Sequence, residues 1–361
     1  MKEISDQRYL KFNRKGRNGR EGISKGRREN SLMLHSRGNI SGSFDCTLPP
    51  PPVALAQDDR RTEVSEMLNC FCSTFRQLES KVLIVFTLLC VVPAFAAGRV
   101  QCASLTSHYV PSPVGYCALL PPSYDSQPAK KYPVLYFLHG LGGDHTFLVN
   151  SGAWSIIEEE QEEKRIGELV IITPQAGTSF YINSKDGRVK YEDFFIREFI
   201  PAMEKKFRVQ AVRTGRAMGG VSMGGYGALR FAFKYPQMFA AVAVHMPALM
   251  EQLPRGSGGA GLTTYMGNAF GRPADGAYWK TNTPFVFART ANLRGLKIYF
   301  DCGDQDDFGF DAGTRELDKL LTARHVPHTS HIYPGHHNWE FVARHIDESL
   351  TFDSQALGLA R

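Results

Sequence analysis

Cysteine is scarce in this sequence, and the spacing of the few cysteines excludes whole classes of site. Of seven cysteines in 361 residues, only Cys102, Cys117 and Cys302 lie beyond residue 97. The chain has no C-x-x-C pair and no cysteine–histidine spacing of the kind that holds zinc. We therefore predict no metal site and no cofactor.

The three cysteines beyond residue 97 do not form an obvious disulfide framework, because their number is odd. The prolines at 111 and 113 disfavour a register that brings Cys102 opposite Cys117, so we do not expect this pair to bond. Cys302 follows an apolar segment and is predicted to be a small buried side chain.

A hydrophobic run long enough to span a membrane is also missing. The apolar stretch 82–92 has 11 residues, whereas a spanning helix needs roughly 20. It follows Arg76 and Lys81 and precedes an A-x-A pattern at 94–96, which is the layout of a secretory signal peptide. Residues 81–97 thus predict a secreted or periplasmic protein. If the segment is not cleaved, it predicts a membrane anchor.

Net charge is nearly absent from most of the chain. The formal charge of +6 arises in residues 1–30, which carry ten Lys/Arg and four Asp/Glu, while the rest has 32 of each sign. A basic arm can bind nucleic acid or anionic lipid, but a solvated lead-in is the simpler interpretation. The neutral body indicates no polyanionic partner, and we predict no nucleic-acid binding.

The first 80 residues give no sign of a fold. They are basic at the start, and residues 49–66, which open with four consecutive prolines, lack apolar periodicity. A signal peptide normally follows a lead of only a few residues, so we expect residues 1–66 to be an extension and the true start to lie downstream, for instance at Met67. Residues 99–361 are then the catalytic domain.

From residue 99 onward, strand-like and helix-like patterns alternate, and no internal repeat is visible. Apolar runs typical of strands occur at 104–110, 114–120, 132–138, 168–172, 214–221, 239–244, 296–300 and 328–333, and helical patterns at 153–164, 191–207, 225–234, 314–324 and 338–352. This alternation predicts an α/β fold: a doubly wound, mostly parallel sheet of about eight strands with helices on both faces. Residues 247–292 interrupt it, either as an excursion over the sheet edge or as ordinary connecting helices.

The run at 220–224 reads G-x-S-x-G and lies between a predicted strand and a predicted helix. In that context it predicts a nucleophile elbow, a tight turn that exposes the hydroxyl of Ser222 at the carboxyl edge of the sheet. The flanking glycines let the strand and the helix approach closely. The helix N-terminus favours negative charge developing there.

An activated serine needs a base and an acid, and the chain offers both after Ser222 in the order that this topology requires. The acidic loop that follows the strand 296–300 contains four candidate acids, Asp301, Asp304, Asp306 and Asp307. The turn before the last helix contains two candidate bases, His336 and His337. The loop lacks the closing glutamate of a twelve-residue calcium site. The spacing G-x-H before a helix favours His337.

A tetrahedral intermediate also needs donors for its oxyanion. One is the N–H of Met223, which follows the proposed nucleophile. We assign the second to the N–H of Leu141, in the glycine-rich loop 139–143 that follows an early strand. His139 opens this loop. It is a further candidate base, but support of the loop by hydrogen bonds is the simpler prediction.

Several motifs together resemble the esterase D family of α/β-hydrolases, which includes S-formylglutathione hydrolases, feruloyl esterases and mycolyltransferases. The matching segments are LPPSY at 120–124, YP at 132–133, FLHGLGG at 137–143, YIN at 181–183, GVSMGGYGA at 220–228, G-x-x-D at 303–306 and G-x-H-x-W at 335–339. The elbow segment is the most specific of them, and the similarity spans about residues 104–352.

This resemblance implies an α/β-hydrolase fold with Asp306 as the acid and His337 as the base. It departs from the family at Met246-Pro247, where relatives often carry a Ser-Gly pair. We assign substrate contacts to His139, Tyr181 and Trp339, and Phe147 and Phe308 are further candidates for an aromatic cleft wall.

We therefore predict an exported serine esterase acting on carboxylic or thioesters of a small molecule or carbohydrate. Alternatives are S-formylglutathione hydrolysis, which export disfavours because that substrate is cytosolic, and acyl transfer to a sugar hydroxyl. A non-catalytic binding module on the same fold is a third alternative.

Overall fold

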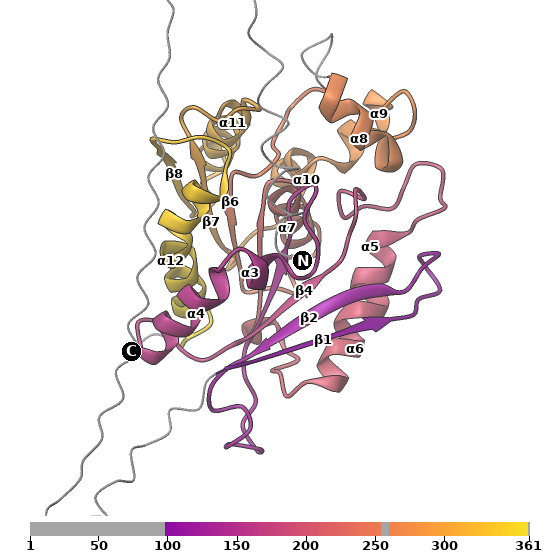
Figure 1. Ribbon diagram of the computed structural model, residues 1–361. Coiled ribbons are helices and arrows are strands. Elements are labelled where there is room, and N and C mark those ends of the chain that lie inside the picture. The colour runs from indigo at the N-terminus through magenta and orange to yellow at the C-terminus, as the bar shows by residue number, and fades with distance from the viewer. Residues whose placement is uncertain (1–97, 254–259, 360–361) are drawn as a thin grey trace, which may run out of the picture. The chain divides into compact units, whose positions relative to one another are not determined.

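The structure is a computed structural model that describes residues 98–253 and 260–359, with side chains described outside 254–264 (Figure 1). The predicted lead-in and the predicted signal segment 81–97 lie outside the described residues. In the part of the chain that is described, no helix combines the length and apolar character needed to cross a membrane.

Eight strands form a single sheet in the order β1-β2-β4-β3-β5-β6-β7-β8. They are β1 (Arg99–Leu105), β2 (Val114–Leu120), β3 (Val134–Leu138), β4 (Val170–Pro174), β5 (Arg216–Val221), β6 (Ala241–His245), β7 (Lys297–Gly303) and β8 (Thr329–Tyr333). β1 pairs antiparallel with β2, and β2 pairs antiparallel with β4. Every pair of neighbouring strands from β4 to β8 is parallel. The predicted doubly wound, mostly parallel sheet of about eight strands is confirmed.

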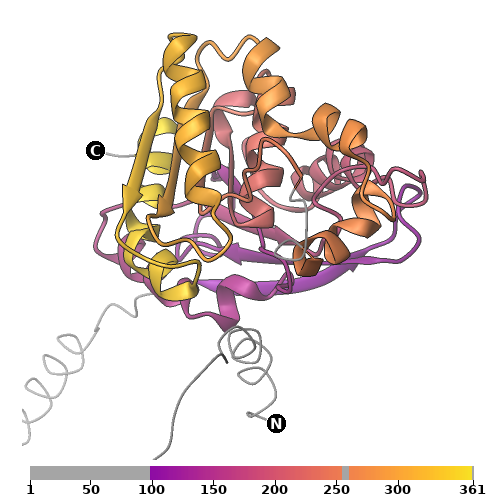
Figure 2. The same ribbon diagram turned by 90° about the horizontal axis from the view of Figure 1, so that it is seen from above.

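Helices connect the strands and cover the sheet (Figures 1 and 2). They are α3 (Phe147–Asn150), α4 (Ala153–Glu162), α5 (Tyr191–Phe194), η1 (Phe195–Phe199), α6 (Ile200–Lys206), η2 (Arg213–Gly215), α7 (Met223–Lys234), α8 (Ala260–Phe270), α9 (Gly276–Asn282), α10 (Pro284–Thr290), α11 (Phe310–Ala323) and α12 (Trp339–Ala356). α4 packs against α12, and α12 lies on β6 and β7. α7 lies on β3, β5 and β6 and contacts α10, which contacts α11.

The core lies on both faces of the central strands. Every residue of β3, β4 and β6 is buried, as expected of parallel strands that are covered on both sides. β1 alternates between exposed and half-buried positions, because it is an edge strand with one face toward solvent. The continuous apolar runs in the sequence therefore report burial on two faces.

The first strand differs from its prediction, and this changes the fate of two cysteines. It spans Arg99–Leu105 rather than 104–110, and the two prolines fall in the loop that joins it to β2. In this register Cys102 lies directly opposite Cys117, and their sulfur atoms form a disulfide bond. The expectation that this pair does not bond is wrong, because it placed the strand five residues too late.

The interruption at 247–292 consists largely of helices. α8, α9 and α10 lie between β6 and β7, and residues 254–259 are outside the described part. Trp279 of α9 is fully buried and stacks on Tyr226 of α7, with ring centroids 5.4 Å apart. The aromatic residues of this insertion thus anchor it to the helix that follows Ser222.

Candidate active site

Ser222 lies in the turn between β5 and α7, in a backbone conformation that most residues avoid. Its φ is 57° and its ψ is −117°, a combination that costs about 1–3 kcal/mol and persists only where the surroundings hold it. A Cβ on Gly224 would lie 1.9 Å from the carbonyl oxygen of Leu138, and one on Gly220 would lie 2.6 Å from the carbonyl carbon of Gly224. Only glycine fits at either position, so the G-x-S-x-G pattern forms the tight turn predicted for it.

A chain of two hydrogen bonds joins Ser222, His337 and Asp306. The Ser222 hydroxyl lies 2.9 Å from Nε2 of His337, and Nδ1 of His337 lies 2.6 Å from Oδ2 of Asp306. With Nδ1–H donating to the carboxylate, Nε2 presents a lone pair to the serine hydroxyl. These side chains come from three loops at the carboxyl ends of β5, β7 and β8, so the fold brings together residues 115 positions apart in sequence.

The Asp306 carboxylate is buried and holds its charge through four donors. Oδ1 accepts the N–H groups of Phe308 and Phe310 at 2.9 and 3.2 Å. Oδ2 accepts from His337 and from the thiol of Cys302, whose sulfur lies 3.4 Å away. Burial raises the pKa of Asp306, but the hydrogen bond and charge of His337 and the two backbone donors outweigh it and hold the pKa below its usual value.

The three neighbouring aspartates each have a different partner. Asp304 Oδ1 accepts the N–H of Gly335 at 3.1 Å, and Asp307 Oδ2 accepts the N–H of His337 at 3.2 Å. Asp301 is fully buried and accepts from Nδ1 of His245 at 2.8 Å. Two of the acids therefore hold the backbone of the histidine turn, and only Asp306 reaches the imidazole of His337.

The two candidate histidines are also separated by the structure. The His337 side chain is 11% exposed, whereas that of His336 is 54% exposed and lies near Asp307. Only His337 contacts Ser222. The choice that the sequence alone left open is thus made by geometry.

The loop 139–143 runs against Ser222. A Cβ on Gly140, the residue before Leu141, would lie 3.3 Å from the Ser222 Cβ. Met223 is the first residue of α7, where a backbone N–H has no partner inside the helix. Gly140 and Met223 are thus both adjacent to Ser222, and the N–H groups of Leu141 and Met223 stay the predicted oxyanion donors.

His139 and Tyr181 lie beneath this loop and do not reach the surface. Nε2 of His139 accepts the N–H of Ala176 at 3.0 Å, and Nδ1–H donates to the carbonyl of Gly140 at 2.8 Å. The Tyr181 hydroxyl donates to the His139 carbonyl at 2.9 Å. His139 is 1% exposed and Tyr181 is fully buried. The prediction that His139 supports this loop by hydrogen bonds is confirmed. The assignment of both residues as substrate contacts is wrong, because both side chains are buried and hold the loop.

The neutral form of His139 links the stability of the fold to pH. Burial lowers the pKa of His139 from 6.5 to about 4. As the pH falls, the imidazole is therefore protonated in the unfolded chain before it is protonated in the folded chain. The contribution of His139 to the free energy of unfolding is complete above pH 6.5. It is lost between pH 6.5 and about 4, by up to about 3 kcal/mol. We expect urea unfolding between these pH values to show a weaker pH dependence in His139→Gln than in the wild type.

The exposed residue His108 provides the matched control. His108→Gln keeps the wild-type slope if the burial of His139 is the cause. Equal slopes for the wild type and His139→Gln would contradict the assignment.

Aromatic side chains surround His337. Phe308 is 51% exposed and meets the imidazole edge to face, with centroids 4.8 Å apart, while the buried Phe310 lies 5.3 Å away in the same manner. Trp339 is half-buried and packs edge to face on Phe147 at 5.6 Å. Of the residues suggested for an aromatic wall, Phe308 is the one that is both exposed and in contact with His337.

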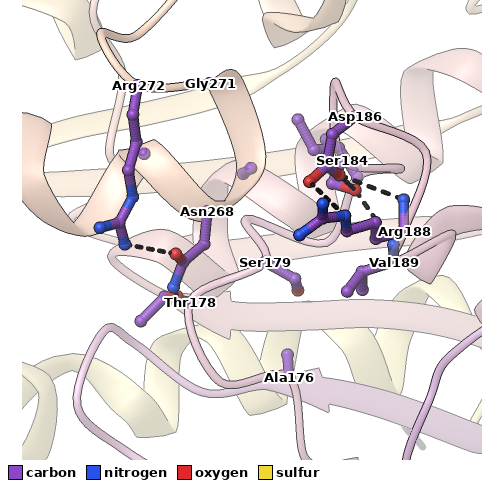
Figure 3. Close-up of a pocket in the computed structure, with 13 residues that line it drawn as sticks. Ala176, Thr178, Ser179, Ser184, Asp186, Arg188, Val189, Asn268, Gly271 and Arg272 are labelled. Carbon is purple, nitrogen blue, oxygen red and sulfur yellow. Dashed lines mark hydrogen bonds and ion pairs between the residues drawn. The ribbon is translucent and has the colours of Figure 1, made fainter.

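A cavity of about 610 Å³ lies between the loop after β4 and the end of α8 (Figure 3). Arg272 donates to the Asn268 side chain, which donates to Thr178, and on the other side Ser184 donates to Asp186. The lining contains none of Ser222, His337 and Asp306. Because none of the three side chains lines it, the cavity does not identify the reaction centre.

Sequence reasoning missed the thiol of Cys302 as a neighbour of the acid. The spacing of four residues between Cys302 and Asp306, across the end of β7, was the available signal. The groups of three or more metal-binding side chains that would suggest a metal ion are absent from the described residues.

Comparison with known proteins identifies the family to which the chain is similar. Residues 107–351 match the Esterase family, described as "Putative esterase". Esterase Rv1288 and Esterase MT1326 of Mycobacterium tuberculosis are each 32% identical over 248 residues, which is 62% of this chain and 52% of either relative. The chain thus spans about half the length of these curated relatives.

Solved structures give the same result for the fold. A ferulic acid esterase superposes with a TM-score of 0.63 at 27% identity, over 73% of this chain and 99% of that one. An S-formylglutathione hydrolase from Agrobacterium tumefaciens superposes with a TM-score of 0.60 at 20% identity, over 73% and 97%. The chain therefore has the α/β-hydrolase fold of these enzymes.

Proposed function

The chain belongs to the Esterase family, and from this premise we propose that it is a serine esterase that works through an acyl-enzyme. The observation that carries the proposal is the hydrogen-bonded chain from Ser222 through His337 to Asp306. Family membership supports ester hydrolysis as the reaction.

In the proposed mechanism, Ser222 Oγ attacks the ester carbonyl while Nε2 of His337 takes the hydroxyl proton. The carbonyl oxygen becomes an oxyanion and receives hydrogen bonds from the N–H groups of Leu141 and Met223. His337 then returns the proton to the departing alcohol, which leaves an acyl group on Ser222. Water, activated by the same imidazole, releases the acid and restores the serine. Asp306 stabilises the imidazolium in both steps.

For the substrate, we propose an ester of an aromatic carboxylic acid. The exposed Phe308 ring stands against the imidazole, where it can pack on an aromatic acyl group. The structural relative at 27% identity is a ferulic acid esterase, which favours the same class. The predicted export of the chain disfavours a cytosolic thioester such as S-formylglutathione.

Phe308→Ala tests this choice of substrate. Loss of a ring contact should raise KM for methyl ferulate about three- to tenfold and leave KM for p-nitrophenyl acetate unchanged, as measured by steady-state hydrolysis. Val212→Ala removes another exposed apolar side chain, outside the loops that carry the proposed catalytic groups. It should leave the KM for both esters unchanged. Equal effects of Phe308→Ala on the two esters, or no hydrolysis of methyl ferulate by the wild type, would exclude aromatic acids as the preferred class.

We also propose that the protein is exported. The disulfide between Cys102 and Cys117 supports this, since such bonds persist in oxidising compartments outside the cytoplasm. N-terminal sequencing of the protein recovered from outside the cytoplasm should find a chain that begins near Gly98. A full-length chain with both thiols reduced, found only in the cytoplasm, would refute export.

A further inference from the structure

Cys302 is the free cysteine of the described residues, and it faces the proposed acid. It is the penultimate residue of β7 and is fully buried. Its sulfur lies 3.4 Å from Oδ2 of Asp306, within reach of an S–H donor. This is the same oxygen that accepts from His337. The thiol and the imidazole therefore share one carboxylate oxygen.

The thiol keeps its proton at any pH at which an esterase works. Burial raises the pKa of Cys302 far above its usual value, and the negative charge of Asp306 and the hydrogen bond to it raise it further. A thiolate could not donate and would repel the carboxylate. Cys302 is thus a permanent donor rather than a reactive nucleophile.

We propose that Cys302 is a positioning residue for the Asp306–His337 pair. The hydrogen bond from its S–H group to Oδ2 of Asp306 sets how strongly that oxygen stabilises the imidazolium of His337. The proposal rests on the proposed function, since it assigns a role within the same reaction. Cys302 touches no reacting atom and acts through Asp306.

The sign of the effect follows from the shared oxygen. Each donor to Oδ2 withdraws some of its negative charge, which leaves less to stabilise a protonated His337. If the thiol is removed, the imidazolium becomes more stable, and a higher pH is needed to free the base. A hydroxyl in its place is a stronger donor than a thiol and has the opposite effect.

Cys302→Ala and Cys302→Ser test this directly through the pH dependence of kcat/KM for p-nitrophenyl acetate. We expect the acidic limb of the profile to move up by about 0.3 pH units in the alanine variant and down by a similar amount in the serine variant. KM should stay unchanged in both. Ile298→Val shortens another buried side chain of β7 without altering any donor, and it should leave the limb in place.

Opposite shifts support the proposal, because a packing role alone predicts the same response to both small residues. Shifts in one direction, or no shift in either variant, would overturn it. If Cys302→Ala does not fold, as judged by circular dichroism, Cys302→Val takes its place as the variant without a donor, and its acidic limb must move up while that of Cys302→Ser moves down. If Ser222→Ala keeps the wild-type activity, the proposed function is refuted, whatever the results for the Cys302 variants.

Discussion

Ser222→Ala should reduce kcat/KM for p-nitrophenyl acetate by a factor on the order of 10⁵ or more, to a rate close to that of buffer. The change removes the attacking oxygen, so no acyl-enzyme can form. The hydroxyl is the group that His337 contacts at 2.9 Å. Alanine has no larger side chain than serine, so the elbow and the fold should survive. The measurement is steady-state hydrolysis, with circular dichroism as the check on folding.

Ser155 provides a matched control for this variant. It is an exposed serine of α4 with no hydrogen bond to the proposed catalytic groups. Ser155→Ala should hydrolyse the ester at the wild-type rate. Turnover of Ser222→Ala above about 1% of the wild-type value would mean that another group attacks the ester, and the proposed mechanism would then be wrong.

His337→Ala should have the second largest effect, a loss in kcat on the order of 10⁴-fold or more. Without the imidazole no group removes the proton of Ser222, and the alcohol leaves without an acid. The adjacent residue is an unusually close control, because His336 is the same residue type and is exposed to solvent. His336→Ala should keep nearly the full rate in the same assay.

The comparison of these two variants identifies which histidine acts as the base. If His336→Ala loses the activity and His337→Ala keeps it, the base has been assigned to the wrong residue. Equal, small losses would mean that neither histidine takes the proton. Added imidazole should partly restore His337→Ala, since a diffusing base can replace the one removed, and it should not affect Ser222→Ala.

The fold was accessible from the sequence because the signal for a buried parallel strand is strong. β3 and β6 are apolar at almost every position and are buried along their whole length. The edge strand β1 was misplaced because a half-exposed strand lacks this continuous apolar run. Cys102 and Cys117 were consequently not expected to bond, although the true register sets them opposite each other.

The candidate site was predictable to the extent that its geometry is local. The elbow needs glycines at fixed offsets from Ser222, and these show in the sequence. Asp306 could not be separated from Asp301 by local pattern, because the separation depends on His245, which lies on another strand. The resemblance to the esterase D family supplied that choice.

The roles of His139 and Tyr181 depend on burial, which motifs do not report. Both belong to segments typical of the family, and the sequence predicts substrate contact for both, although for His139 it also predicts support of the loop. Their polar atoms are bonded to the backbone under the oxyanion loop. A residue of a family motif can thus support the active site indirectly, by holding in place the loop beside Ser222.

The central claim is that His337 activates Ser222, and covalent labelling tests it most directly. Trypsin should release residues 217–230 as one peptide, in which Ser222 is the only serine. After treatment of the wild type with a fluorophosphonate, mass spectrometry should find the adduct on this peptide, and His337→Ala should remain unlabelled. An active enzyme whose peptide 217–230 stays unmodified, or equal labelling of the wild type and His337→Ala, would contradict the account.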